Sequence, residues 1–208
     1  MSVTNDELDI SSSGAAIQRE QAAPRFAEAV TAQMARLEMG SAQLVCQTDL
    51  LPREQWTSAG PQAVEFMFRP GSSMQARPLA RIASGGEVSR VMLAAKVVLG
   101  QADDVETLVF DEVDAGVGGS VANALAEVLA DLARTHQVLV VTHLAQVAVR
   151  GDAHYVVEKR EVEGGVPETS LRELAADERP AEIARMLSGD ATEASLVHAR
   201  EMLDAVRQ

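Results

Sequence analysis

Two short apolar runs, each followed directly by polar residues, restrict the fold of this chain more than any other feature. They are residues 107–110 and 138–142, and both read as short buried strands. Between them, residues 121–132 carry apolar side chains at the spacing of an amphipathic helix. Strands that alternate with helices predict a parallel sheet with helices packed on its faces.

The same alternation continues on both sides of these runs. Residues 85–99 have helical periodicity, and residues 63–69 alternate as a half-buried strand does. The later expected elements are a short helix over 144–150, a strand over 153–159, a turn or hairpin loop at Gly164, Gly165 and Pro167, and two helices near 181–187 and 194–206. The predicted fold class is therefore α/β, with a mostly parallel sheet flanked by helices.

The N-terminal part differs in composition from the rest. Residues 1–18 include Ser11, Ser12, Ser13 and Gly14, and they are expected to form a flexible tail. Residues 19–39 predict one amphipathic helix, with Phe26, Val30, Met34 and Leu37 on one face. Residues 40–208 are expected to form a single globular lobe.

Paired carboxylates end the first apolar run. Asp111 and Glu112 follow residues 107–110 directly, where a parallel strand opens into a ligand crevice. Adjacent carboxylates repel each other unless a cation or a shared proton relieves them, and a Mg²⁺ ion bound to nucleotide phosphates would do so. Asp111 would hold the ion, and Glu112 would act as general base on the attacking water. The alternative is that both residues cap the next helix.

A serine–glycine turn precedes the helix predicted over residues 85–99. Ser84 is a good N-cap, and Gly85 and Gly86 let a ligand approach the backbone, so this turn could bind a terminal phosphate or be an ordinary capped turn. His143 directly follows the second apolar run, at the expected carboxyl end of a strand. An imidazole there can contact a γ-phosphate or orient the attacking water. Three polar motifs at the ends of regular elements favour nucleotide hydrolysis over capping alone.

Composition limits the class of protein. The net charge is −13, which argues against a broad nucleic-acid-binding face, because phosphates are bound by Lys and Arg. A single cysteine, Cys46, allows no disulfide within the chain and suits a reducing compartment. The polar start does not resemble a secretory signal, and no apolar stretch is long enough to span a membrane, so a cytoplasmic location is expected.

The phosphate-binding loop of P-loop enzymes is missing from the sequence. That loop ends in Gly-Lys-Ser or Gly-Lys-Thr, and its lysine reaches the β- and γ-phosphates. The two lysines of this chain, Lys96 and Lys159, follow Ala95 and Glu158. Any phosphate that the other motifs serve must therefore be held by another polypeptide segment.

Together these motifs resemble the heads of ABC-type ATPases of the SMC-like class. Ser84-Gly85-Gly86-Glu87 looks like the signature motif, residues 108–112 look like the Walker B strand with its catalytic glutamate, and His143 looks like the switch histidine. Residues 77–93 and 110–119 are very similar to the corresponding regions of the RecN-like family. Gly118 stands where ABC transporters place an aspartate that contacts the second head, and Asp114 is expected to supply part of that contact.

The resemblance implies a P-loop NTPase-like fold in which this chain is the C-terminal lobe of a head and residues 19–39 lie at the base of a coiled-coil arm. ATP and Mg²⁺ are the implied cofactors. Glu112 and His143 would be catalytic and Asp111 would bind the metal. The implied nucleotide-binding residues are Ser84, Gly85, Gly86, Glu87, Asp114 and Gly116.

The resemblance also implies partners and a role. The partners are an N-terminal lobe that carries Walker A, a second copy in a head dimer, DNA bound by the full-length protein, and recombinase machinery. The role is ATP-dependent head dimerisation and DNA-end engagement in double-strand break repair and recombination, at the nucleoid in the cytoplasm. The chain alone is expected to be inactive as an ATPase, because it lacks Walker A.

Two alternative functions are compatible with parts of the sequence. One is a non-catalytic interaction or dimerisation module of an SMC-like protein. The other is a dinucleotide-binding oxidoreductase, suggested by the Gly-Val-Gly of residues 116–118. The third glycine of the dinucleotide fingerprint is replaced by Val121, and the preceding acidic residues would repel a pyrophosphate.

Overall fold

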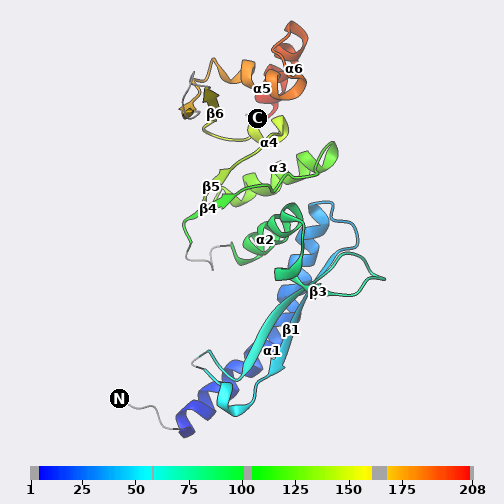
Figure 1. The fold of residues 1–208 in the computed structure, drawn as a ribbon, viewed down its shortest axis with the longest axis vertical. Helices are drawn as coiled ribbons and strands as arrows, with labels where there is room; N and C mark the ends of the chain where they lie inside the picture. Colours follow the sequence, from blue (N-terminus) through cyan, green and yellow to red (C-terminus); the bar gives the residue numbers. More distant parts are fainter. Residues whose placement is uncertain (1–4, 58, 101–104, 161–167, 207–208) are drawn as a thin grey trace. The chain divides into compact units, whose positions relative to one another are not determined.

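The computed structural model describes residues 5–57, 59–100, 105–160 and 168–206. The chain divides into two compact units, Met1–Glu106 and Thr107–Gln208 (Figure 1). The boundary falls inside the lobe expected over residues 40–208. The domain limits drawn from the sequence remain predictions.

The first unit combines a long helix with an antiparallel sheet and a second helix. Its helices are α1 (Asn5–Arg36) and α2 (Gly85–Leu99), and its sheet has the order β1-β2-β3. The strands are β1 (Gln43–Leu50), β2 (Gln62–Arg69) and β3 (Arg77–Pro78), with the short 3₁₀ helices η1 (Arg53–Gln55) and η2 (Leu79–Arg81) in the connections. Helix α2 has the limits that its periodicity predicts.

Helix α1 begins earlier than the sequence predicts. Residues 5–18, expected as a tail, are helical, and the helix ends at Arg36 rather than at residue 39. Serine lowers helix propensity by only a fraction of a kcal/mol per residue, and the alanines that follow have the highest propensity, so the serine run does not stop the helix. The predicted apolar face is correct, since Val30, Met34 and Leu37 are buried.

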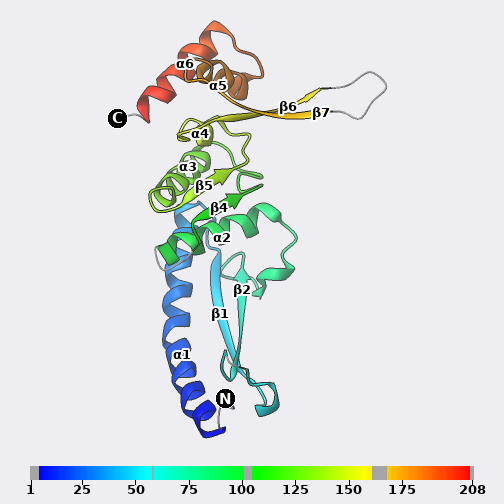
Figure 2. The same cartoon turned by 90° about the vertical axis from the view of Figure 1, so that its left-hand side faces the viewer.

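The β1–β2 hairpin packs along α1. The Leu44 N–H donates to Thr31 Oγ1 at 3.0 Å, and the rings of Phe26 and Phe66 lie 5.9 Å apart. Near the other end of the hairpin, the Arg19 guanidinium donates to the Ala59 carbonyl oxygen. These contacts tie the helix to the hairpin over much of its length (Figure 2).

The second unit contains the predicted parallel strands. β4 (Thr107–Phe110) pairs with β5 (Gln137–Val140) in parallel, and α3 (Ser120–Leu132) connects them. Leu108 and Phe110 are buried while Thr107 and Val109 are exposed, and along β5 half-buried residues alternate with exposed ones. The prediction of two buried strands is therefore wrong, because one face of this sheet is covered and the other is open. Helix α3 runs beside both strands in the two ribbon views (Figures 1 and 2).

The C-terminal part of this unit is a hairpin followed by helices. Its elements are α4 (Ala145–Ala148), β6 (Tyr155–Arg160), β7 (Glu168–Glu173), α5 (Arg179–Ser188) and α6 (Glu193–Ala205). Helices α4, α5 and α6 share one apolar cluster, built around Ile183, Ala184 and Ala199. The two final helices appear where their periodicity predicts them.

The expectation of a mostly parallel sheet holds only for β4 and β5. β6 pairs antiparallel with β7, a strand that the sequence pattern does not predict although residues 164–167 indicate a turn or hairpin loop, and β1–β3 are antiparallel as well. Every residue of β7 is exposed, so it lacks the apolar alternation by which a half-buried strand is recognised. The turn predicted at residues 164–167 lies outside the described residues.

In the described part of the chain, each helix is too short or too polar to cross a lipid bilayer.

Candidate functional site

The carboxyl ends of β4 and β5 meet at one edge of the parallel sheet. Phe110 lies opposite Val140 in the register, and the Val141 N–H donates to the Phe110 carbonyl oxygen at 2.9 Å. The residues that follow each strand therefore emerge side by side. Asp111 and Glu112 come from β4, and His143 comes from the segment after β5, as the sequence predicts.

The alternative that Asp111 and Glu112 cap the next helix is wrong. Helix α3 starts at Ser120, and its N-cap is Gly119, which offers no side chain. A turn separates the carboxylates from this helix, with the Ala115 N–H donating to the Glu112 carbonyl oxygen at 3.0 Å. Both carboxylates are exposed, so another reason must account for their place at the strand end.

Glu112 has an unusual backbone conformation. Its φ angle is +57°, in the left-handed region that costs a residue with a Cβ about 1–2 kcal/mol. Glu38, the other described non-glycine residue with positive φ, follows the end of α1, where such a conformation commonly terminates a helix. Glu112 follows a strand instead, and strain at such a position is characteristic of functional sites.

We expect the strain at Glu112 to reverse the usual order of alanine and glycine. Glu112→Gly should be more stable than Glu112→Ala by about 1 kcal/mol, because glycine adopts positive φ without steric cost. Denaturant unfolding of the two variants measures this difference. At Glu127, inside α3, the same pair should show the opposite order, with alanine more stable by about 1 kcal/mol. Equal stabilities at position 112 would show that the left-handed conformation is not strained.

Asp114 is the buried member of this group. Its side chain is 4% exposed, and its Oδ2 accepts hydrogen bonds from Thr142 Oγ1 at 2.6 Å and from the His143 N–H at 3.0 Å. The ring nitrogen Nδ1 of His143 lies 3.1 Å from the same oxygen, while the His143 side chain is 70% exposed. One carboxylate thus joins the turn after β4 to the segment after β5. That Asp114 binds nucleotide stays a prediction.

Thr142 is the residue that the sequence analysis overlooked. Besides donating to Asp114, its Oγ1 accepts the Leu144 N–H at 3.0 Å. The signal was present, since Thr142 directly precedes His143 at the end of a buried run. Strand ends of a parallel pair adjoin, so a hydroxyl there can reach a carboxylate after the neighbouring strand.

The chemistry of this edge fits a partial magnesium site. Among the described residues, no group of three or more His, Cys, Asp and Glu side chains could hold a metal ion by itself. Mg²⁺ bound with a nucleotide needs only one or two protein carboxylates, because phosphates and waters complete its shell. An exposed carboxylate at the strand end, as Asp111 is, suits that requirement.

The serine–glycine turn forms the start of α2. Ser84 is the N-cap, and its Oγ accepts the Glu87 N–H at 3.3 Å, as predicted from the sequence. Gly85 is exposed and Gly86 is buried. Burial lowers the pKa of Arg90, one turn further on, and the charge of Glu87 acts in the opposite direction. This turn lies in the first unit, whereas the carboxylates and His143 lie in the second.

Gly116 lies in the turn between β4 and α3. Its φ angle is +71°, and a Cβ at this position would meet nothing within 4 Å. Glycine is therefore needed for the backbone conformation rather than for space. The Val117 N–H donates to the Asp114 carbonyl oxygen at 3.0 Å, which closes the turn around the buried carboxylate.

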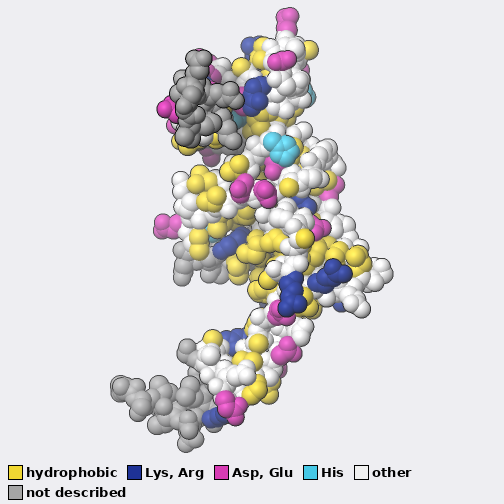
Figure 3. All heavy atoms as spheres, in the orientation of Figure 1, with side chains coloured by type: hydrophobic (Ala, Val, Ile, Leu, Met, Phe, Trp, Pro, Cys, Tyr) yellow, Lys and Arg dark blue, Asp and Glu magenta, His cyan; other side chains and the backbone are white. Residues whose placement is uncertain are grey.

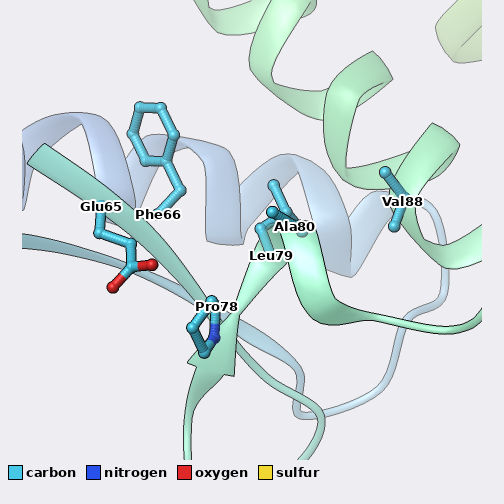
Figure 4. Close-up of a pocket in the computed structure, with 6 residues that line it drawn as sticks. All are labelled: Glu65, Phe66, Pro78, Leu79, Ala80 and Val88. Carbon is cyan, nitrogen blue, oxygen red and sulfur yellow. The ribbon is translucent and has the colours of Figure 1, made fainter.

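An apolar hollow of about 280 Å³ lies elsewhere in the first unit (Figure 4). It is lined by residues of β2, β3, η2 and α2, namely Glu65, Phe66, Pro78, Leu79, Ala80 and Val88. Only Glu65 among them is charged, and its charge is negative. This lining is unsuited to phosphate, so the hollow is not the candidate site.

The sequence is similar to those of bacterial proteins named DNA repair protein RecN. It is 43% identical to the protein of Mycobacterium leprae, over 98% of this chain and 38% of that protein. It is 47% identical to the protein of Deinococcus radiodurans, over 89% of this chain and 32% of that protein. It is 44% identical to the protein of Treponema pallidum, over 91% of this chain and 34% of that protein. The chain thus spans about a third of the length of these relatives. No family model matches the chain.

The fold is similar to solved SMC head domains. One is the Smc head domain of Pyrococcus furiosus with an extended coiled coil, bound to the C-terminal domain of ScpA. It has a TM-score of 0.55 and 15% identity, over 97% of this chain and 42% of that one. The Smc head domain of Pyrococcus yayanosii with a coiled coil and joint has a TM-score of 0.52 and 16% identity, over 92% of this chain and 30% of that one. The predicted α/β fold of an SMC-like head lobe is confirmed.

Proposed function

The chain is a homologue of the C-terminal part of the RecN family of DNA repair proteins, and on that premise we propose that it is one half of an ATP-hydrolysing head. In this proposal the half supplies the groups that act on the γ-phosphate, while a second lobe with Walker A holds the nucleotide. The observation that carries the proposal is that Asp111 and Glu112 follow β4, and His143 follows β5, at the edge where the carboxyl ends of these two parallel strands adjoin.

Each of these residues has a role that follows from its chemistry. Asp111 would hold Mg²⁺, which neutralises charge on the phosphates of ATP when it is bound. Glu112 would accept a proton from the attacking water, and its strained backbone supports a place in the reaction. His143 would offer its exposed ring to the γ-phosphate or to that water.

The start of α2 would contact a different nucleotide. Ser84, Gly85, Gly86 and Glu87 form a capped helix N-terminus, whose N–H groups and dipole favour an anion. In the proposed cycle this anion is the γ-phosphate held by a second copy of the head. ATP would then join two heads, and hydrolysis would release them. Asp114 and Gly116 would shape the turn that faces the second head.

The open face of the parallel sheet supports the proposal that another lobe packs on it. Val109 is 66% exposed, Val141 is 61% exposed and Leu139 is 48% exposed. Hydrophobic side chains gather at the surface over β4 and β5 (Figure 3). Parallel sheets are normally covered on both faces, so a further layer is expected to pack here. The lobe that carries Walker A is the proposed layer.

We expect the purified chain alone to lack ATPase activity and to gain it with the missing lobe. The reason is that a phosphate-binding lysine loop cannot be replaced by the residues described above. Co-expression of this chain with the Walker A segment of a RecN relative, followed by a phosphate-release assay, measures the effect. His143→Ala in this chain is the control, since it should remove most of the restored activity.

The outcome of co-expression also separates the two candidate functions. Restored hydrolysis supports the enzyme half. Binding of the lobe without hydrolysis would favour the non-catalytic module instead. Turnover by the isolated chain, surviving the His143→Ala change, would contradict both the split head and the role of the histidine.

The wider role is proposed by extension from the relatives. RecN proteins are named for DNA repair. The full-length protein would use the ATP cycle to engage DNA ends during double-strand break repair, together with recombinase machinery at the nucleoid. With a net charge of −13, this chain is not expected to supply a broad DNA-binding face itself.

A further inference from the structure

The buried carboxylate of Asp114 is the feature of the site that the proposed roles leave unexplained. It belongs to the turn after β4 and reaches residues more than 25 positions later in the sequence. Burying a carboxylate is costly unless hydrogen bonds compensate for its lost hydration. Here Oδ2 accepts hydrogen bonds from the Thr142 hydroxyl and the His143 backbone N–H, and Nδ1 of the His143 ring lies within hydrogen-bond distance of it. The carboxylate is thus held by two consecutive residues of one segment.

The position of Asp114 determines which ring nitrogen of His143 carries hydrogen. A carboxylate accepts hydrogen bonds and donates none, so Nδ1 at 3.1 Å must be protonated to interact favourably. In the neutral ring, Nε2 is then left as the acceptor, and it lies on the side of the ring away from Asp114. Neutral histidine in water exists as both tautomers, so the carboxylate imposes a choice.

We propose that Asp114 is a positioning residue, whose buried carboxylate holds Nδ1–H of His143 and presents Nε2, as a hydrogen-bond acceptor, to the attacking water. Thr142 supports the same carboxylate and fixes its orientation by its 2.6 Å hydrogen bond. The reference to the attacking water rests on the proposed function. The hydrogen-bonded unit itself does not, because all its members are residues of this chain.

The unit also links the two strand ends mechanically. Asp114 lies two residues after Glu112, and His143 lies three residues after the end of β5. A displacement of the turn that carries Glu112 would therefore move the ring of His143 as well. The proposed base and the imidazole of His143 would change position together when a second head packs on this edge.

The tautomer of His143 provides a direct test on the chain as it stands. Long-range ¹H–¹⁵N spectra distinguish protonated from unprotonated ring nitrogens in neutral imidazole, and His143→Gln identifies the signals. At alkaline pH, where the imidazole is neutral, the His143 ring should carry its hydrogen on Nδ1 in nearly all molecules. A ring protonated mainly at Nε2 in the unmodified chain would overturn the proposal, whatever the ATPase assays show.

Asp114→Asn tests the cause of that preference. An asparagine can donate through its amide, so the Nδ1–H form should lose its dominance while the circular dichroism spectrum is retained. Thr142→Val keeps the carboxylate and should lessen the preference. Asp131→Asn, an exposed change in α3, should leave the His143 signals unchanged. If Asp114→Asn does not fold, the unmodified chain and Thr142→Val still decide the question.

The reconstituted head gives the functional readout. Asp114→Asn should lower kcat roughly 10- to 100-fold, the loss that typically follows removal of a group that orients an active residue, with little change in KM. Combined with His143→Ala it should cause no further loss, because both changes disable the same unit. Additive losses would contradict the positioning role. A reconstituted head without activity in any form would refute the proposed function instead.

Discussion

Glu112→Gln is expected to lower ATP hydrolysis by the full-length protein about 10²- to 10⁴-fold, the usual contribution of a general base. Glutamine has nearly the same shape as glutamate but cannot accept the proton of the attacking water. ATP binding should be retained, because the metal-binding role is assigned to Asp111. Two heads should consequently stay joined by unhydrolysed ATP, which size-exclusion chromatography and a phosphate-release assay would measure together.

Glu106→Gln is the matched control for this prediction. Glu106 is an exposed glutamate immediately before β4, whereas Glu112 lies beyond the other end of the same strand. The charge change is identical, yet Glu106→Gln should hydrolyse ATP at the normal rate. Normal hydrolysis by Glu112→Gln would show that this residue is not the base, and the strained backbone at position 112 would need another explanation.

Ser84→Asp is expected to abolish ATP-dependent association of two heads while leaving each head folded. Aspartate caps a helix as well as serine does and suits its positive end, so α2 should remain intact. A carboxylate about 4 Å from a γ-phosphate charge would be repelled by about 4 kcal/mol at an effective dielectric constant of 20. That energy corresponds to roughly 10³-fold weaker association in the presence of a non-hydrolysable ATP analogue.

Ser84→Ala separates repulsion from loss of the cap. Removing the Ser84 hydroxyl should destabilise the protein by about 1 kcal/mol, because the Glu87 N–H loses its partner. It adds no charge, so heads should still associate with ATP. Sedimentation velocity measures association and denaturant unfolding measures stability. Unimpaired association of Ser84→Asp would show that this turn does not meet a phosphate of the second head.

The local parts of the site were accessible from the sequence. Ser84 as an N-cap, the limits of α2 and the strand that leads to Asp111 all depend on neighbours within a few residues. The same holds for the placement of His143 after a short apolar strand. Periodicity and capping preferences report such short-range relations, so no tertiary information was needed.

Three features of the structure could not be predicted from such short-range patterns in the sequence. The sequence indicates a turn or hairpin loop after β6, but it does not predict β7 as its partner strand, because β7 is exposed throughout and carries no apolar pattern. The early start of α1 also differs from the prediction of a flexible tail, because a serine run disfavours a helix only weakly and does not by itself indicate disorder. The left-handed conformation of Glu112 has no sequence signal, since glutamate rarely adopts it.

By itself, the sequence determined which elements form in the second unit as far as β6 and which polar residues stand at the ends of the parallel strands. The tertiary structure alone decided that Asp114 is buried, that Thr142 and His143 bind it, and that the Glu112 backbone is strained. The physical reason is the separation along the chain of the residues that interact. Helix periods and caps depend on adjacent residues, whereas the Asp114 unit exists only because the register of β4 on β5 brings together residues far apart in the chain.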